Sequence, residues 1–187
     1  MPTFDTAVFA LALGIGAVLS SSATARTQSP VRTVPSVDLD RYVGDWFEIA
    51  RFPNRFQRQC VSAVRASYAR RTDGRIDVIN RCRTADGQTE ARGVARIEDE
   101  RTFAKLKVRF APAWLSFLPA VWGDYWVIGL APDYSWAVVG DPDREYLWIL
   151  ARTPRLGDDA LAAARAAARD NGFDVERLVP TPQSQHP

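Results

Sequence analysis

The stretch Val43-Gly44-Asp45-Trp46-Phe47-Glu48-Ile49-Ala50-Arg51-Phe52 decides the fold. It has the composition of a β-strand, with a glycine at its entrance and a large aromatic side chain two residues later. Side chains alternate between the two faces of a strand, so we expect Trp46 and Glu48 on one face and Arg51 on the other. Taken alone, Trp46 is a large core residue, and only the rest of the chain can give it another role.

Further short segments with the pattern of strands follow at intervals of roughly ten residues. Thr72-Asp73-Gly74 and Asp86-Gly87 lie between them and are hairpin turn signals. The segments lie near residues 64–69, 76–80, 93–97, 105–110, 125–130, 135–140 and 146–151. Together with the first strand they predict an all-β protein, an antiparallel barrel or sandwich.

One α-helix is predicted after these strands, over residues 158–170. The segment is rich in alanine, has acidic residues in its first turn and ends before Asn171-Gly172. These features suit helix propensity, the helix dipole and a C-terminal cap. Its apolar stripe is narrow, so we expect it to lie against the outside of the strands.

The composition indicates one globular domain and argues against a nucleic-acid partner. The chain has 187 residues, 47% of them hydrophobic, with 24 basic and 22 acidic side chains and a net charge of +2. The basic residues are spread evenly and form no stripe that could follow a phosphate backbone. Only Lys105 and Lys107 are lysines, which leaves few candidates for lysine chemistry, and no cofactor is expected.

The first 25 residues are predicted to be a signal peptide. Residues 7–19 are apolar, and Ala23-Thr24-Ala25 offers a cleavage site. An uncleaved membrane anchor is the alternative, although the apolar run is short for a span. Residues 26–36 are expected to be a flexible leader, residues 37–180 the folded domain and residues 181–187 a disordered tail.

Four blocks of sequence resemble the lipocalin family, in particular its bacterial Blc-like branch related to apolipoprotein D. They are Gly44-x-Trp46 with residues 47–51, Asp73-Gly74 with residues 78–80, residues 125–128, and residues 141–154. A Gly-x-Trp motif alone recurs by chance. The other three blocks, in the right order and at the right spacing, extend the resemblance over the whole mature domain.

The resemblance implies an eight-stranded antiparallel up-and-down barrel that holds one apolar ligand, with the C-terminal helix packed outside. It also implies that Trp46 closes one end of the barrel and that Arg152, at the end of the last strand, lies across it. A guanidinium stacked on an indole makes a cation–π contact while its donors reach nearby carbonyl groups. The opening motif would then be a structural latch, and the ligand would lie above it.

Inward-facing residues above the latch are the candidates for the ligand pocket. An apolar wall with a few aromatic side chains suits an acyl chain, although each residue is equally suited to fill a packed core. Glu48 would face the same interior and would need a hydrogen-bond partner, for which Tyr68 and Asn80 are candidates. Strand alternation nominates Val64, Ala66, Tyr68, Val78, Leu106, Val108, Trp126, Ile128, Val138, Tyr146 and Trp148.

Loops at residues 53–59, 83–87, 111–122 and 141–144 are expected to gather at the open end of such a barrel. The loop 111–122 carries several large apolar side chains, among them Trp114, Phe117 and Trp122. These side chains either fold over the mouth as a lid or form a hydrophobic lip that contacts a membrane or a partner transiently.

Cys60 and Cys82 are the only cysteines, and an even pair in an exported protein is predicted to form a disulfide. The hairpin register about Asp73-Gly74 does not place them opposite each other, so the bond requires a bulge or a loop. A metal or redox pair is the alternative, but it lacks further ligands and a Cys-x-x-Cys spacing.

The sequence argues against an enzyme and against a metal site, because its only histidine, His186, lies in the tail. We expect a lipid-binding lipocalin that stores or transports fatty acids or (lyso)phospholipids in the bacterial cell envelope, supports membrane maintenance and is a monomer or homodimer. It would be periplasmic or associated with the outer membrane, without an N-terminal lipid-anchor cysteine. Two alternatives stay open: a lipid-modifying enzyme using Glu48 or a free Cys60, and an interaction module docking through residues 114–122.

Overall fold

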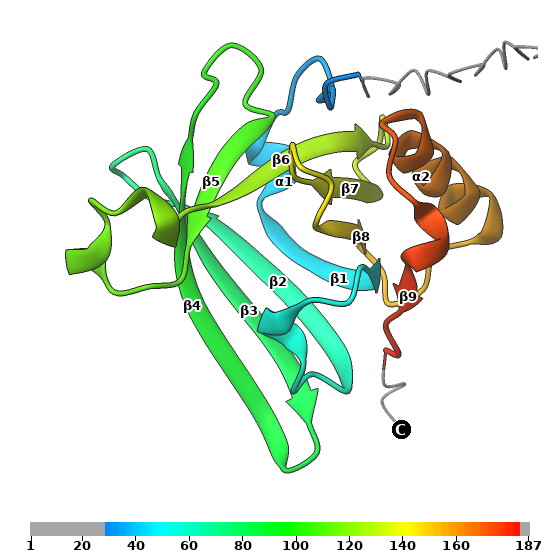
Figure 1. Cartoon of the computed structure of the whole chain (residues 1–187), viewed down its shortest axis with the longest axis horizontal. Helices are drawn as coiled ribbons and strands as arrows, with labels where there is room; N and C mark the ends of the chain where they lie inside the picture. Colours follow the sequence, from blue (N-terminus) through cyan, green and yellow to red (C-terminus); the bar gives the residue numbers. More distant parts are fainter. Residues whose placement is uncertain (1–28, 184–187) are drawn as a thin grey trace, which may run out of the picture.

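The computed structural model describes residues 29–183, which form a closed β-barrel with a helix packed outside (Figure 1). Each strand pairs antiparallel with its sequence neighbours, and β1 pairs with both β2 and β8, which closes the barrel. This confirms the predicted up-and-down topology. The strands are β1 (Gly44–Arg51), β2 (Ser62–Arg70), β3 (Ile76–Thr84), β4 (Gly87–Ile97), β5 (Lys105–Arg109), β6 (Gly123–Leu130), β7 (Trp136–Gly140) and β8 (Leu147–Ala151).

The turn between β2 and β3 shows how local sequence sets the hairpins. The Arg71 amide donates to the Arg75 carbonyl at 2.8 Å, and the Asp73 carboxylate accepts from the Arg75 amide at 3.1 Å. Gly74 adopts a φ of +81°, a left-handed conformation that costs glycine no steric strain. The predicted Asp-Gly signal therefore forms the turn between β2 and β3, at the end of the barrel where β1 begins.

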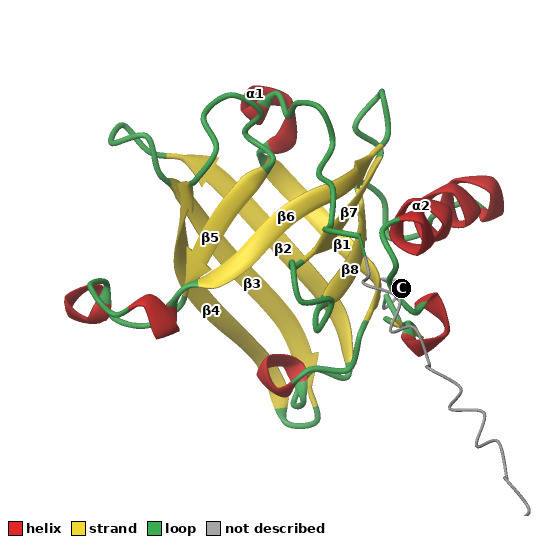
Figure 2. Cartoon of the chain, turned by 45° about the horizontal axis from the view of Figure 1, so that its top comes forward, coloured by secondary structure: helices red, strands yellow, loops and turns green. Residues whose placement is uncertain are grey.

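The two ends of the barrel are built differently (Figure 2). The short helix α1 (Leu39–Tyr42) covers one end, and the Asp38 side chain caps it by accepting from the amides of residues 40 and 41. The loops after β1, β3, β5 and β7 meet at the other end. They contain the short 3-10 helices η1 (Arg55–Gln57), η2 (Ala113–Leu115) and η3 (Pro119–Val121).

Helix α2 (Asp158–Asp170) lies on the outside of the barrel against β6 and β7. Its buried residues are Ala164 and Ala168, the narrow stripe expected from the sequence. Gly129 lets the helix approach closely, because a Cβ there would lie 2.9 Å from the Cβ of Ala167. The small residues on both surfaces thus set the distance between helix and barrel wall.

The segments before and after the barrel are ordered further than expected. In the leader, Val31 is buried and the Val34 amide donates to the Val127 carbonyl at 2.9 Å. After α2, the chain forms η4 (Val175–Arg177) and a ninth strand, β9 (Val179–Pro180), which pairs with β1. Thr181 is buried, so the expected disordered tail does not begin there. The signal peptide predicted for residues 1–25 lies outside the described residues.

Candidate functional site

The closed end of the interior is formed by Trp46, which is fully buried. Arg152 lies over it, with the guanidinium carbon 3.8 Å from the ring centroid. The guanidinium also donates to the main-chain carbonyls of residues 41, 42, 43 and 45 at 2.6–3.1 Å. Burial lowers the pKa of Arg152, because the charged form loses contact with water. The structure thus places these two residues in the latch that the resemblance implied.

Several predicted pocket residues face the interior above this latch. Tyr68, Leu106 and Val108 line a cavity of about 20 Å³, and Val78 and Trp148 belong to the same apolar cluster. Tyr68, Val108 and Trp148 are only half-buried, although barrel strands surround them. The interior above the latch is therefore not completely filled by these side chains.

Val64 and Ala66 lie on the interior face of β2. Arg65, between them, turns outward, where its guanidinium carbon lies 4.4 Å from the Phe47 ring centroid. Ala66 pairs with Trp46 in the β1–β2 ladder, just above the latch. Val64 is buried higher in the barrel.

Trp126, Ile128 and Val138 do not face the interior, contrary to our expectation. All three belong to the apolar cluster under α2, on the outer surface of the barrel. Their neighbours Tyr125 and Val127 face inward instead. Because α2 covers the outer face of β6 and β7, both faces of these strands are apolar, and the sequence does not show which face is inside.

Tyr146 lies at the rim of the open end rather than inside the barrel. Its ring stacks on Trp148, with the ring centroids 5.9 Å apart and the ring planes 8° from parallel. Phe56 of η1 packs against Tyr146, with the two ring centroids 5.6 Å apart. The Trp148 indole N–H donates to Gln57 Oε1 at 3.0 Å. Three aromatic rings therefore form one side of the entrance.

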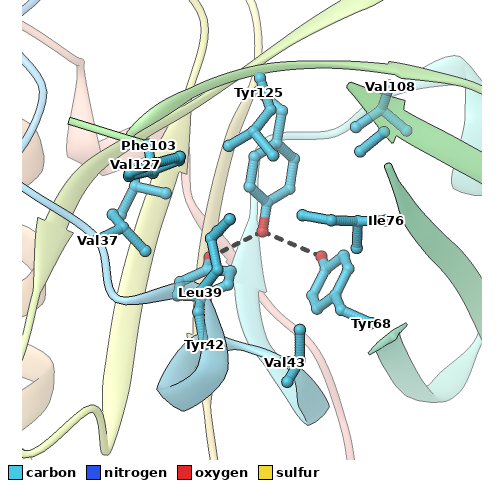
Figure 3. A pocket seen from close by; sticks show the side chains of 12 residues that line it. Val37, Leu39, Tyr42, Val43, Tyr68, Ile76, Phe103, Val108, Tyr125 and Val127 are labelled. Atoms are coloured by element: carbon cyan, nitrogen blue, oxygen red, sulfur yellow. Dashed lines mark hydrogen bonds between the residues drawn. The ribbon is translucent and has the colours of Figure 1, made fainter. Parts of the chain in front are cut away.

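A cluster of three phenol hydroxyl groups was missed in the sequence (Figure 3). Tyr125 Oη lies 2.8 Å from Tyr42 Oη and 3.0 Å from Tyr68 Oη. Burial raises the pKa of Tyr68 to about 12 and raises the pKa of Tyr42 and of Tyr125 as well. Of these three, only Tyr68 was nominated, because we assigned Trp126 rather than Tyr125 to the inner face.

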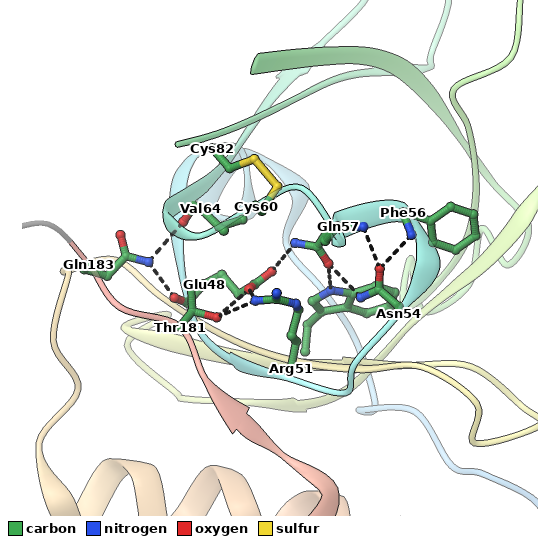
Figure 4. The surroundings of a disulfide bond; sticks show 11 residues. Glu48, Arg51, Asn54, Phe56, Gln57, Cys60, Val64, Cys82, Thr181 and Gln183 are labelled. Carbon is green, nitrogen blue, oxygen red and sulfur yellow. Dashed lines mark hydrogen bonds and ion pairs between the residues drawn. A yellow bond between two sulfur atoms is a disulfide. The ribbon is translucent and has the colours of Figure 1, made fainter. Parts of the chain in front are cut away.

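Glu48 faces the upper interior and is almost completely buried (Figure 4). Its carboxylate accepts from Arg51 Nη1 at 2.8 Å, from Gln57 Nε2 at 2.6 Å and from Thr181 Oγ1 at 2.5 Å. These partners replace the expected Tyr68 and Asn80. Every partner is a donor, so three hydrogen bonds hold the buried carboxylate in place.

Arg51 reaches Glu48 because β1 contains a bulge. The register against β8 shifts between Glu48 and Ala50, so the alternation of side chains reverses along β1. Arg51 therefore lies on the same side as Glu48, not on the opposite side as expected, and Ala50 packs under α2. A bulge of this kind leaves no clear mark in a single sequence.

The C-terminal segment fills a gap in the barrel wall beside Glu48. The β1–β2 ladder ends at the pair Phe47 and Arg65, and β9 takes over the free edge of β1. Gln183 Nε2 then bridges the two strands by donating to the Glu48 carbonyl at 2.6 Å and the Val64 carbonyl at 3.2 Å. The open half of the seam is thus closed by residues 179–183.

Cys60 and Cys82 form a disulfide, which confirms the prediction. The register between β2 and β3 shifts between Ser62 and Arg65, and Ala63 has a φ of +53°. This irregularity brings the loop before β2 alongside the end of β3. The bond therefore ties the entrance loop that carries η1 to the barrel wall.

The loop between β5 and β6 extends away from the barrel (Figure 1). Trp114 is 72% exposed and Phe117 is 74% exposed. Trp122 is held differently: its indole N–H donates to the Ser116 carbonyl at 2.8 Å, and the Arg96 guanidinium carbon lies 4.4 Å from its ring centroid. The loop therefore presents two large apolar side chains to solvent on a base fixed by Trp122.

Two kinds of feature are not found within residues 29–183. No cluster of three or more His, Cys, Asp or Glu side chains in this range is arranged to hold a metal ion. No helix in the same range is both long enough and apolar enough to cross a membrane.

Comparison with known proteins agrees with this architecture. A family model described as a lipocalin-like domain matches residues 37–183. Temperature-induced lipocalin-1 of Arabidopsis thaliana is 39% identical over 159 residues, which are 84% of this chain and 85% of that protein. Outer membrane lipoprotein Blc of Escherichia coli (strain K12) is 40% identical over 151 residues, which are 80% of this chain and 81% of that protein.

Among solved structures, insecticyanin from the tobacco hornworm Manduca sexta superimposes with a TM-score of 0.64 at 20% sequence identity. The match covers 83% of this chain and 85% of that one. At this identity the likeness shows the barrel fold alone.

Proposed function

Because the chain belongs to the lipocalin family, we propose that it binds an acyl lipid, a fatty acid or a lysophospholipid, inside the barrel and carries it in the cell envelope. The observation that carries the proposal is the half-buried state of Tyr68, Val108 and Trp148, which face the interior. An apolar, accessible cavity with few polar groups suits a hydrophobic ligand. The family generally comprises binding proteins rather than enzymes, which agrees with the satisfied network around Glu48.

The two ends of the interior differ in a way that indicates at which end a ligand enters the barrel. The latch of Trp46 and Arg152 blocks one end, whereas the other is bordered by the rings of Phe56, Tyr146 and Trp148. An acyl chain can pass these rings at little cost, because they offer apolar surface. A charged headgroup would stay at the entrance, because burying it inside the barrel is unfavourable.

Titration of the delipidated protein with a fluorescent fatty acid tests the proposal. We expect saturable binding of one molecule per chain, and native mass spectrometry should show the same stoichiometry. Val108→Trp fills the interior and should weaken binding at least tenfold, whereas Ala162→Trp adds the same indole to the exposed face of α2 and should not. Equal binding by both variants would place the ligand outside the barrel and contradict the proposal.

The exposed side chains of the β5–β6 loop support a role as a membrane lip. Trp114 and Phe117 are more than two-thirds exposed, at 72% and 74%, and exposed apolar groups of this size usually mark contacts. We therefore favour the lip over the lid. In flotation with phospholipid vesicles, Trp114→Ser and Phe117→Ser should lower the bound fraction, whereas Val179→Ser, at another exposed apolar position, should not. If all three variants float like the parent, the lip is not the contact.

We also propose that the protein is exported to the periplasm or the outer membrane. The disulfide suits an oxidising compartment, and the relative Blc is named an outer membrane lipoprotein. Cell fractionation combined with N-terminal sequencing tests this proposal. A mature chain beginning at Arg26 in the envelope fraction is expected, and a cytoplasmic chain with both thiols free would contradict it.

A further inference from the structure

Resting on the proposed function, we propose that the hydroxyl groups of Tyr42, Tyr68 and Tyr125 form a recognition site for an oxygen atom at the buried end of the ligand. The preferred ligands would be chains that carry a hydroxyl or carbonyl group at the end remote from the headgroup. An acyl chain ending in a plain methyl group would bind less tightly.

The direction of the hydrogen bonds leaves one donor free. Tyr125 has a single hydroxyl proton and gives it to Tyr68, at 3.0 Å. Tyr42 must then be the donor in its 2.8 Å contact with Tyr125. The proton of Tyr68 is left without an acceptor among the described residues, so the chain of hydroxyl groups ends in a donor that is available to a ligand.

The surroundings of this donor are apolar. The other side chains that line the cavity are aliphatic or phenylalanine, among them Ile76, Leu106 and Phe103. None of these side chains can accept a hydrogen bond, so the donor is satisfied only by an acceptor that enters the cavity. Figure 3 shows the three hydroxyl groups pointing toward one another within this apolar wall.

The size of the cavity limits what can bind there. Its volume of about 20 Å³ exceeds the ~10–15 Å³ that one water molecule needs. This space accepts a single hydroxyl or carbonyl group and is too small for a phosphate. The headgroup must therefore stay at the open end, and only the far end of the ligand can meet the tyrosines.

The charge of Arg152 favours an acceptor at this place. Burial raises the pKa of Tyr42, and the nearby guanidinium acts against that rise. A positive charge close to the phenols attracts the negative end of a carbonyl or hydroxyl dipole. The latch thus supports the site electrostatically without contacting the ligand.

The test compares fatty acids from laurate to stearate with their ω-hydroxy counterparts, by displacement of a fluorescent fatty acid from the full mature chain. At the chain length that reaches the cluster, the ω-hydroxy acid should bind about fivefold more tightly than the matched plain acid. Tyr68→Phe keeps the ring and should remove this preference. Tyr134→Phe removes a hydroxyl at the same end that bonds to the Asp38 amide outside the cavity, and should keep it.

Each outcome separates this inference from the proposed function. Binding of plain and ω-hydroxy acids with equal affinity at every length would overturn the inference and leave lipid binding intact. A preference for the ω-hydroxy acid that survives in Tyr68→Phe would likewise overturn the inference and leave lipid binding intact. Failure of every acid to bind the parent protein would overturn lipid binding as well. The ligand series on the parent protein decides the matter even if a variant does not fold.

Discussion

Thr181 donates its hydroxyl proton to the Glu48 carboxylate at 2.5 Å, joining two residues that lie 133 positions apart. The same carboxylate accepts a hydrogen bond from Arg51. The Glu48 side chain is only 4% exposed and the Arg51 side chain 14%. Because β1 and β2 separate at this level, the contact holds the C-terminal segment in the barrel wall. The stability of the entrance therefore depends on the last described residues of the chain.

Thr181→Val should lower the free energy of unfolding by about 1–2 kcal/mol, because it keeps the shape and removes the hydroxyl from a buried network. Glu48→Gln should cost about 3 kcal/mol, because it leaves the Arg51 cation without its carboxylate. Urea unfolding measures both. Thr72→Val, at an exposed turn position, is the matched control and should change little. Equal losses in all three variants would mean that the network contributes nothing specific.

Removal of the latch should also destabilise the barrel. Arg152→Ala loses the cation–π contact with Trp46 and the donors to four main-chain carbonyls, which together stabilise the fold by about 2 kcal/mol. Arg155→Ala removes the same kind of side chain from an exposed position three residues later. Thermal unfolding should show a clear fall in Tm for the first variant and almost none for the second. The reverse order would refute the latch.

The fold could be predicted because its signals are local. The Asp73-Gly74 turn and the strand spacing each act within a few residues, and together they predict an antiparallel barrel or sandwich. The resemblance to the lipocalins, which includes the Gly44-x-Trp46 motif, selects the barrel. The position of α2 was predictable for the same reason, since its caps and its alanine stripe are contained in one segment.

The site was less predictable because it depends on which face of each strand is inside. In β6 and β7 both faces are apolar, so alternation does not separate Trp126 from Tyr125. In β1 a bulge brings Arg51 to the side of Glu48. Thr181 was missed for a third reason, since its partner is distant in sequence. Contacts between distant segments leave no pattern in the sequence around either partner.

Loss of the disulfide should lower stability without changing the fold. Cys60 and Cys82 are separated by 22 positions, and closing a loop of this length stabilises a protein by about 3 kcal/mol. The double variant Cys60→Ser with Cys82→Ser should unfold at lower urea concentration. The parent protein treated with a reductant should match it. Reduced and oxidised parent proteins of equal stability would show that the bond does not constrain the unfolded chain.

The phenols inside the barrel predict a loss of stability at alkaline pH. Burial raises the pKa of Tyr68 to about 12, against about 10 in an unfolded chain. Below pH ~10 the phenol is neutral in both states, so pH has no effect through it. Between about 10 and 12 the unfolded chain releases the proton first, and the free energy of unfolding falls as pH rises. Urea unfolding from pH 9 to 11 should show this fall, and Tyr68→Phe should make it shallower. An unchanged slope in the variant would assign the fall to other groups.

The contact between β7 and the segment after α2 should tolerate no added methyl group. A Cβ at Gly140 would lie 2.6 Å from Phe173 Cζ, and the Phe173 ring is buried against Phe52. Gly140→Ala should therefore cost about 1–3 kcal/mol, because the ring must move within a packed cluster. Gly123→Ala is the matched control, since the nearest atom to its Cβ lies 3.9 Å away. In a Phe173→Leu background, Gly140→Ala should cost less stability than it does in the parent protein, because the clashing ring is no longer present. A double variant whose losses simply add would show that the two residues do not share this space.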